Sequence, residues 1–122
     1  MPEPAFCLYC GEKLTTKQIE GRDYRACSRE GCGFVYWDNP LPVVAAIVEH
    51  EGKVLLARNK LWPVKMYGLI TGFLEKGESP EGAVLREVKE ELGLDGKLVG
   101  LVGLYAFRER NQLIIAYHVT AA

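Results

Sequence analysis

Runs rich in apolar residues, separated by turn residues, recur along the chain, and one further stretch follows a helical period instead. Runs of this kind predict strands. The stretches cover residues 41–50, 53–58, 68–75, 97–107 and 112–121. Glu51-Gly52 separates the first two, which therefore form a predicted hairpin. The pattern predicts a mixed β-sheet.

The helical period covers residues 80–92. Ser79 is a good N-cap, Pro80 suits the first helical position, and Gly93 can take the left-handed conformation that ends a helix. At about 100° per residue, four apolar side chains share a stripe that should pack on the sheet: Val84, Leu85, Val88 and Leu92. The fold class is therefore α+β.

The face of this helix beside the apolar stripe is acidic. Glu87 lies three and four residues before Glu90 and Glu91. Arg86 and Lys89 should point to the remaining side, so no basic residue is expected between the glutamates. Like charges at this spacing destabilise a helix by about 0.2–0.5 kcal/mol per pair. A solvated surface is the ordinary interpretation, and a bound Mg²⁺ is the alternative that would offset the repulsion.

Residues 72–94 resemble the Nudix box. That pattern runs Gly, five residues, Glu, seven residues, Arg-Glu, an aliphatic, any residue, Glu-Glu, any residue, Gly and an aliphatic. Every defined place is filled, by Gly72, Glu78, Arg86, Glu87, Val88, Glu90, Glu91, Gly93 and Leu94. Chance agreement at this many positions is very improbable, so the signal is strong.

The resemblance implies hydrolysis of a nucleoside diphosphate linked to another group, such as ADP-ribose, NADH or a similar dinucleotide or nucleotide sugar. It also implies Mg²⁺ or Mn²⁺ bound by the box. Carried over by position, Glu87 and Glu91 are the first ligands and Glu90 is the next. The backbone carbonyl near Thr71 or Gly72 is a further expected ligand.

In similar proteins the box arginine pairs with the first box glutamate and orients the ligands, which here implies an ion pair between Arg86 and Glu78. The general base varies among such proteins and stays unassigned. Glu109 is the one glutamate after the box, although a charged hairpin tip is its ordinary interpretation.

Candidate substrate contacts are weaker. Arg58 and Lys60 follow a strand and could meet phosphate, and three aromatic residues could stack on a base: Trp62, Tyr67 and Phe107. A core or surface role is the ordinary interpretation for each of them. His50 and His118 are given no ligand role.

All four cysteines lie near the start of the chain: Cys7, Cys10, Cys27 and Cys32. Two close pairs fit a tetrahedral metal site. Gly11 and Gly33 follow the pairs and can adopt positive φ, which lets backbone amides face the sulfurs. The spacing predicts a zinc ribbon with structural Zn²⁺; two disulfides or an iron site are the alternatives.

Composition and charge indicate which kinds of binding partner are not expected. The chain has 122 residues, 48% hydrophobic residues and a net charge of -1, so no general attraction to nucleic acid or membrane is expected. Acidic and basic residues are mixed in the predicted ribbon, which argues against a nucleic-acid face. The first residues lack the basic start and apolar stretch of a signal peptide, so a cytoplasmic protein is expected.

WDNPLP marks the expected boundary, giving a zinc ribbon over residues 1–37 and a Nudix hydrolase domain over 38–122. This order resembles zinc-ribbon-bearing Nudix proteins similar to the NADH pyrophosphatase group. NADH-directed members carry Ser-Gln-Pro-Trp-Pro-Phe-Pro after the box, which this chain lacks, so NADH is only one candidate. The alternative function is a catalytically weak or inactive zinc-ribbon module that binds nucleotide or protein.

Similar domains continue through further strands and a closing helix, so this one is expected to be short at its C-terminus. A compact natural variant, a fragment, or a fold completed by a second copy are the open explanations. The apolar stretch over residues 112–119 would be an exposed edge if uncovered, which favours a homodimer.

Overall fold

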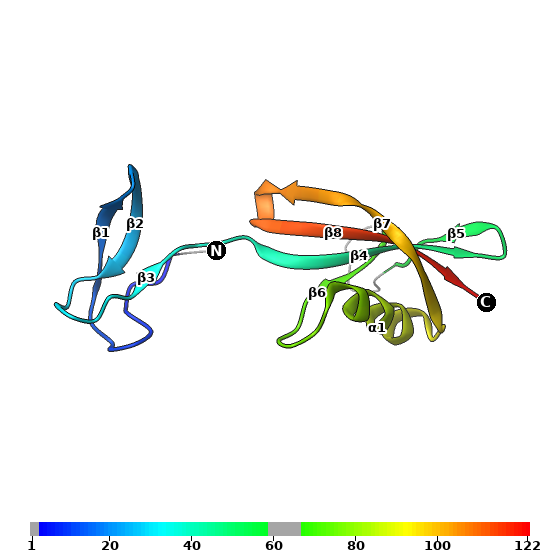
Figure 1. The fold of residues 1–122 in the computed structure, drawn as a ribbon, viewed down its shortest axis with the longest axis horizontal. Coiled ribbons are helices and arrows are strands. Elements are labelled where there is room, and N and C mark those ends of the chain that lie inside the picture. Colours follow the sequence, from blue (N-terminus) through cyan, green and yellow to red (C-terminus); the bar gives the residue numbers. More distant parts are fainter. Residues whose placement is uncertain (1–2, 59–66) are drawn as a thin grey trace. The chain divides into compact units, whose positions relative to one another are not determined.

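The computed structural model describes residues 3–58 and 67–122. The chain divides into two compact units between Asn39 and Pro40. Figure 1 shows the three strands of the first unit and the strands and helix of the second. No helix in the described part of the chain has the length and apolar character needed to cross a bilayer.

The first unit is a three-stranded antiparallel sheet. Its strands are β1 (Leu14–Ile19), β2 (Arg22–Cys27) and β3 (Val35–Tyr36), in the order β1-β2-β3. Its buried residues are few: Leu14, Cys7 and Cys27 form the centre, with Cys10, Cys32 and Phe34 packed around them. Because most of this core is cysteine, the unit lacks the apolar area that would hold a small domain together.

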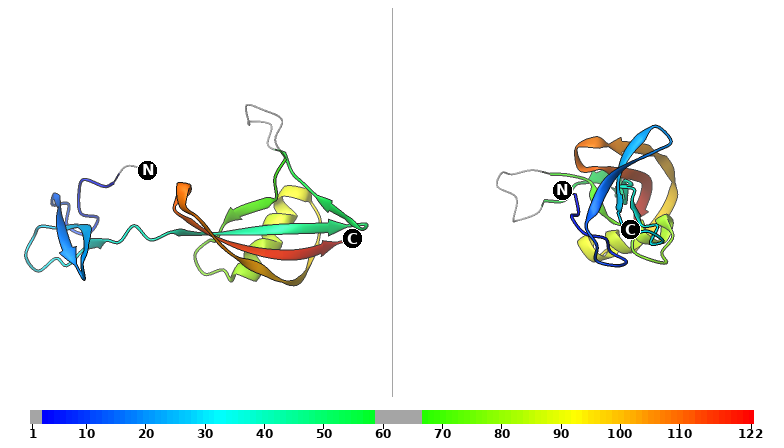
Figure 2. Two further views of the ribbon diagram at one scale, coloured as in Figure 1. Left: turned by 90° about the horizontal axis from the view of Figure 1, so that it is seen from above. Right: turned by 90° about the vertical axis from the view of Figure 1, so that its left-hand side faces the viewer.

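The second unit is a five-stranded mixed sheet with one α-helix. In chain order its elements are β4 (Leu41–His50), β5 (Lys53–Leu55), β6 (Ile70–Phe73), α1 (Pro80–Leu92), β7 (Gly96–Phe107), the short 3₁₀ helix η1 (Arg108–Arg110) and β8 (Gln112–Ala121). The sheet order is β5-β4-β8-β7, and β6 pairs with β4 beside β5. β4 and β8 are parallel, as Figure 2 shows, and the other pairs are antiparallel.

Local signals placed the helix and the first hairpin correctly. The Ser79 side chain accepts a hydrogen bond from the Gly82 amide at 3.1 Å, and Gly93 has φ 69°, so both predicted helix ends are confirmed. Glu51 and Gly52 both have positive φ (52° and 76°), which is the conformation of a two-residue hairpin turn. β5 ends at Leu55 and is therefore shorter than the predicted stretch over residues 53–58.

One face of the sheet packs on α1. The buried core joins Val84 and Val88 of the helix to alternate residues of β4, β6 and β8: Val44, Ala46, Val48, Ile70, Tyr117, Val119 and Ala121. Leu85 and Leu92 pack against this core while remaining partly exposed, so the predicted apolar stripe is confirmed. The core therefore fixes α1 against β6, and that contact builds the candidate site.

The condition under which residues 112–119 would form an exposed edge is not met. β8 lies inside the sheet, with β4 on one side and β7 on the other. β7 is the end strand on one side of the sheet, and its Leu101 and Leu104 side chains are exposed. β5 and β6 lie at the other side, and a homodimer stays a prediction.

Candidate active site and metal centre

A close approach between β6 and α1 places one glutamate of the helix. A Cβ added to Gly72 would lie 2.1 Å from Cδ of Glu87, a separation that no real side chain tolerates. Glycine at position 72 therefore leaves the space that the Glu87 carboxyl group occupies. The backbone of β6 and this carboxylate lie together because α1 is packed tightly on the sheet.

Arg86 and Glu78 form a two-pronged ion pair. The Arg86 Nε and Nη2 atoms each donate to a Glu78 carboxylate oxygen at 2.7 Å. The Glu75 amide also donates to Glu78, at 2.8 Å. The Arg86 guanidinium, followed by the Glu75 amide, holds the pKa of Glu78 down at about 2. Two parallel bonds fix the orientation of both side chains as well as their charge.

The expectation that Arg86 points away from the acidic face is wrong. Its Nη1 atom donates to Glu87 at 2.8 Å and to Glu90 at 3.2 Å, and its Nη2 atom reaches the Phe73 carbonyl oxygen at 3.3 Å. Helical angle places the Cβ atom, whereas the long arginine side chain turns back toward the strand. A cation of the protein itself therefore offsets part of the repulsion among the glutamates.

The remaining repulsion is concentrated between Glu91 and Glu87. Partial burial, the neighbouring Glu87 charge, the hydrogen bond with Glu87 and the Glu90 charge raise the pKa of Glu91, in that order of size. Much of the Glu91 side chain nevertheless remains exposed. Two neighbouring carboxyl groups with this mutual repulsion could together bind a hard divalent ion, which prefers carboxylate oxygens.

The cysteines form a tighter ligand set than the glutamates. Their four sulfur atoms all lie within 4.8 Å of one another, and within residues 3–58 and 67–122 no other group of histidine, cysteine or acidic side chains converges in this way. Glu90 is held by Arg86, so Glu87, Glu90 and Glu91 do not gather as a trio. Glu87 and Glu91 are the two that lie together.

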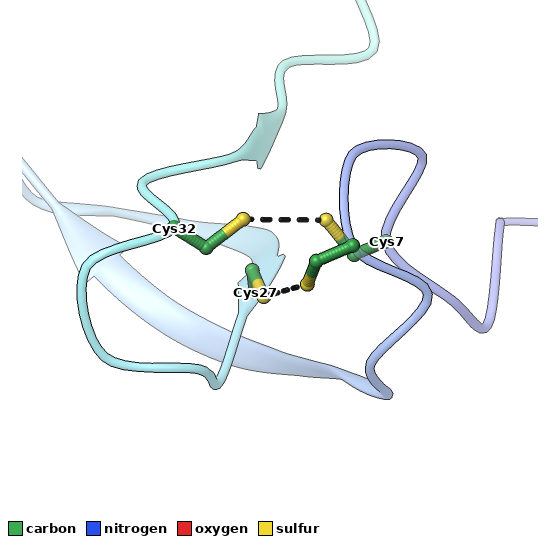
Figure 3. Close-up of side chains that lie close together, drawn as sticks. Cys7, Cys27 and Cys32 are labelled. Carbon is green, nitrogen blue, oxygen red and sulfur yellow. Dashed lines mark hydrogen bonds between the residues drawn. The ribbon is translucent and has the colours of Figure 1, made fainter.

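The sulfur separations fit a tetrahedral metal and exclude disulfides. Cys7 Sγ lies 3.7 Å from Cys32 Sγ, and Cys10 Sγ lies 3.5 Å from Cys27 Sγ (Figure 3). Four sulfurs at about 2.3 Å from a zinc ion would be about 3.8 Å apart, whereas a disulfide needs about 2.05 Å. All four cysteines are free thiols in this structure, so the disulfide alternative is wrong.

Backbone amides support the cysteine cluster. The Tyr9 amide donates to Cys7 Sγ at 3.3 Å and the Arg29 amide to Cys27 Sγ at 3.4 Å. Gly11 and Gly33 have positive φ (81° and 75°) as predicted. Burial acts to raise the pKa of Cys7, but hydrogen bonds from backbone amides lower it to about 7. Burial raises the pKa of Cys27 to about 12, so that thiol needs a bound cation to ionise at neutral pH.

Comparison with known families identifies the second unit. A family model described as the NUDIX domain matches residues 39–121, which is more than half of the chain and contains the whole box. The chain belongs to the Nudix family. The resemblance inferred from residues 72–94 is therefore confirmed.

Two curated relatives illustrate what this Nudix protein is similar to. An ADP-ribose pyrophosphatase of Methanocaldococcus jannaschii is 35% identical over 102 residues, which cover 83% of this chain and 56% of the relative. A NAD-capped RNA hydrolase, NudC, of Pseudomonas putida is 28% identical over 120 residues, which cover 98% of this chain and 42% of the relative. The chain thus spans about half the length of these relatives.

A solved structure shares the fold of the Nudix protein along nearly its whole length. A NUDIX hydrolase from Nitrosomonas europaea superposes with a TM-score of 0.84 at 25% identity, covering 98% of this chain and 68% of that one. The predicted mixed sheet with the box helix packed on it is thereby confirmed, and the converging cysteines fit the predicted ribbon.

Outside the box, the other predicted site residues of the Nudix protein are exposed or lie beyond the described part. Glu109 lies on η1 at the tip of the β7-β8 hairpin, and Arg58, Tyr67 and Phe107 are exposed. Lys60 and Trp62 lie outside the described residues. Among the described residues, no hydrogen bond or ion pair joins Glu109 to the box, so its role as a base stays a prediction.

The two histidines make structural contacts. His50 Nδ1 lies 2.9 Å from the Ala121 carbonyl oxygen. His118 Nε2 lies 3.0 Å from a Glu49 carboxylate oxygen. Both contacts tie β4 to β8.

Sequence reasoning missed three contributors to the site. The Glu75 amide and the Phe73 carbonyl hold Glu78 and Arg86 through backbone atoms, which a side-chain pattern cannot reveal. Tyr117 donates its hydroxyl to Glu81 at 3.2 Å and so links β8 to the first turn of α1. The spacing of Glu75, three residues before Glu78, was the only sequence signal for any of these contacts.

The Glu78 ion pair gives a testable pH dependence. Because its folded pKa of about 2 lies below the ordinary value of about 4.3, this pair stabilises the fold above about pH 4.3. That contribution should be lost as the pH falls through about 2. ¹³C NMR of the Glu78 carboxyl carbon should show it still ionised at about pH 3. Replacing Arg86 with methionine should raise this pKa toward its usual range; an unchanged titration would contradict the assignment.

Proposed function

We propose that this Nudix protein hydrolyses the diphosphate bond of a nucleoside diphosphate linked to another group, in the presence of Mg²⁺ or Mn²⁺. The observation that carries the proposal is the Glu87 carboxylate, which is pressed against Gly72, held by Arg86 and adjacent to Glu91. A solvated acidic helix face would need none of these constraints.

Three groups of the site would hold the divalent ion. Glu87 and Glu91 would supply the carboxylate oxygens, and the backbone carbonyl near Gly72 on β6 is the third expected ligand. Glu90 can join once it leaves Arg86. When bound, the ion neutralises phosphate oxygens and lowers the pKa of an attacking water.

The other residues act by positioning. Arg86 connects Glu78, Glu87 and the Phe73 carbonyl, so it fixes the Glu87 carboxylate relative to β6. Neighbours of this kind typically change metal affinity or activity by about 10- to 100-fold when they are removed. We therefore assign Arg86 and Glu78 to positioning and leave the proton acceptor to experiment, with Glu109 as the candidate to replace first.

The proposed substrates are ADP-ribose-type and NAD-type diphosphates. The two relatives are named as an ADP-ribose pyrophosphatase and a NAD-capped RNA hydrolase. ADP-ribose and NAD both contain an internal diphosphate. The box recognises phosphate and metal, so it does not distinguish between these groups. The exposed Tyr67 and Phe107 rings are candidates for contact with a base.

We also propose that the four cysteines bind a structural Zn²⁺. Two short sulfur separations, amide hydrogen bonds to the sulfurs and the scarcity of other core residues in the first unit support this assignment. Thiolates favour zinc in closed four-ligand sites. Iron is the alternative that metal analysis separates from zinc.

Replacing Glu91 with glutamine should abolish turnover while leaving the fold intact. The amide keeps the size of the side chain but loses the negative charge that a hard cation needs. Turnover of ADP-ribose, NADH and nucleotide sugars would be measured by phosphate-product chromatography with Mg²⁺ present. Asp95→Asn is the matched control, because Asp95 is an exposed carboxylate whose contact is with Lys89.

This measurement also separates the enzyme from its main rival. An inactive ribbon-bearing protein would turn over none of these substrates and would still bind nucleotide tightly. Equal activity of Glu91→Gln and the unaltered protein would contradict the assigned ligand role. Reaction in ¹⁸O-labelled water would then show which phosphorus is attacked.

A further inference from the structure

The strand register of the first unit sorts its side chains onto two faces. Leu14 pairs with Cys27, so their side chains share the face of the cysteine cluster. The alternate positions point to the opposite face, which we call the outer face. Its members are Thr15, Lys17, Ile19, Arg22, Tyr24, Ala26 and Val35.

Trp37 extends the outer face. It follows Val35 by two residues, and its ring packs on that of Tyr24 with centroids 5.0 Å apart and planes at 70°. In an edge-to-face pair the two rings are not stacked face on face, so part of their aromatic surface stays free of the other ring. Trp37 is 49% exposed, so an aromatic surface is available to a planar ligand.

The charges of the outer face are of one sign. Lys17 is directly opposite Tyr24 in the register, and Arg22 lies two residues before Tyr24 on the same strand. Both cations are exposed, and no acidic residue of β1, β2 or β3 shares this face. Asp23 lies on the face of the cysteines, and Asp38 accepts a hydrogen bond from Tyr36, whose side chain also points to that face.

The neighbouring cation of the opposite face is already engaged. Arg25 donates to the Leu14 carbonyl and to Thr16, and it lies 3.9 Å from Glu3. The mixture of charges along the sequence therefore separates in three dimensions. One face holds paired charges, and the outer face holds two exposed cations beside two aromatic rings.

We propose that the outer face binds single-stranded nucleic acid. Bases would stack on Trp37 beside Tyr24, and Lys17 and Arg22 would contact the flanking phosphates. Stacking on aromatic side chains between cations is the usual way in which proteins hold single strands without reading sequence. A duplex hides its bases from such a surface. This activity goes beyond the proposed hydrolysis and departs from the expectation that the mixed charges of the ribbon argue against a nucleic-acid face.

Fluorescence anisotropy with the zinc-loaded protein, both units included, tests the proposal. The probes are labelled single strands of RNA and DNA of about 12 nucleotides and a duplex of the same sequence, with Mg²⁺ omitted. Because no hydrolysis is measured, failure of the enzyme proposal would leave this test unaffected. Single strands should bind more tightly than the duplex. Trp37→Ala should weaken binding on the order of 10-fold or more, and Trp37→Phe should retain most of it.

The electrostatic part has its own matched comparison. Lys17→Gln and Arg22→Gln should each reduce the slope of log K against log salt by about 0.7. Lys13→Gln removes the same charge from an exposed residue of the first unit that lies outside the three strands and should change the slope less. Equal effects of Lys13→Gln and Lys17→Gln, or a preference for the duplex, would overturn the proposal.

A direct contact measurement completes the test. The chain has two tryptophans, so Trp62→Phe leaves Trp37 as the only one. Its fluorescence should be quenched on addition of an unlabelled single strand, because bases that stack on indole quench its emission. Binding without any quenching would place the strand elsewhere on the protein and would overturn the proposal.

Discussion

Replacing Cys27 with serine is expected to unfold the first unit while the second unit stays folded. Cys27 is 2% exposed and stands at the centre of a core that is mostly cysteine. A structural zinc site contributes about 10–16 kcal/mol in small zinc-dependent folds, which equals or exceeds the whole stability of a typical domain at about 5–15 kcal/mol. Loss of one ligand therefore removes the main source of stability of this unit.

Zinc content by mass spectrometry and amide NMR signals would report the two parts of this prediction. Signals of residues 3–39 should collapse to unfolded positions, and those of residues 40–58 and 67–122 should stay dispersed. Ser28→Ala is the control, because Ser28 is exposed and its hydroxyl donates to the Lys13 carbonyl at 2.9 Å, so it supplies no sulfur to the cluster. A Cys27→Ser protein with a full zinc complement or a folded ribbon would contradict the assignment.

What the sequence could predict was local. The ends of α1 depend on Ser79, Pro80 and Gly93, which act on their immediate neighbours, so the helix bounds were predicted to the residue. The hairpin at Glu51-Gly52 is equally local. The box motif placed Glu87 and Gly72 in one site. The family pattern includes both residues, although nothing in their own chemistry predicts that α1 contacts β6 at this point.

What the sequence could not predict depends on distant contacts. Residues 112–121 are not at an edge because β8 pairs with β4, beginning with Leu41 and Gln112. No local signal in the sequence predicts this pairing, nor that β7 lies on the other side of β8. The turn of Arg86 toward Glu90 depends on a flexible side chain and on the Phe73 carbonyl. The outer face of the ribbon appears only when the register separates Lys17 from its acidic sequence neighbours.

Gly72→Ala is expected to cost little stability and most of the catalytic activity. The added Cβ would overlap Cδ and Oε1 of Glu87 at 2.1 Å, but these atoms end a flexible side chain that can rotate away. In a strand, alanine is favoured over glycine by roughly 0.5–1 kcal/mol, which offsets part of the displacement. The displaced carboxylate loses its place beside Arg86 and Glu91, so turnover and Mn²⁺ affinity should fall by at least about 10- to 100-fold.

Gly100→Ala is the matched control for this substitution. A Cβ at Gly100 meets no atom within 4 Å, and the residue lies in β7 without positive φ. Thermal unfolding, Mn²⁺ binding by electron paramagnetic resonance and turnover would be compared for both variants. Gly100→Ala should leave all three nearly unchanged. A Gly72→Ala protein with full metal affinity would show that the Glu87 carboxylate does not need the space above β6.

The double variant shows whether Gly72 acts through Glu87. If the methyl group of Gly72→Ala does nothing except move the Glu87 carboxylate, then adding it to Glu87→Gln should cause no further loss of Mn²⁺ affinity, because that carboxylate is already gone. Independent effects would instead add, as they do for sites that share no partner. Additive losses would mean that residue 72 contributes through its own backbone, and the carbonyl expected as a ligand at this position would then be the group to examine.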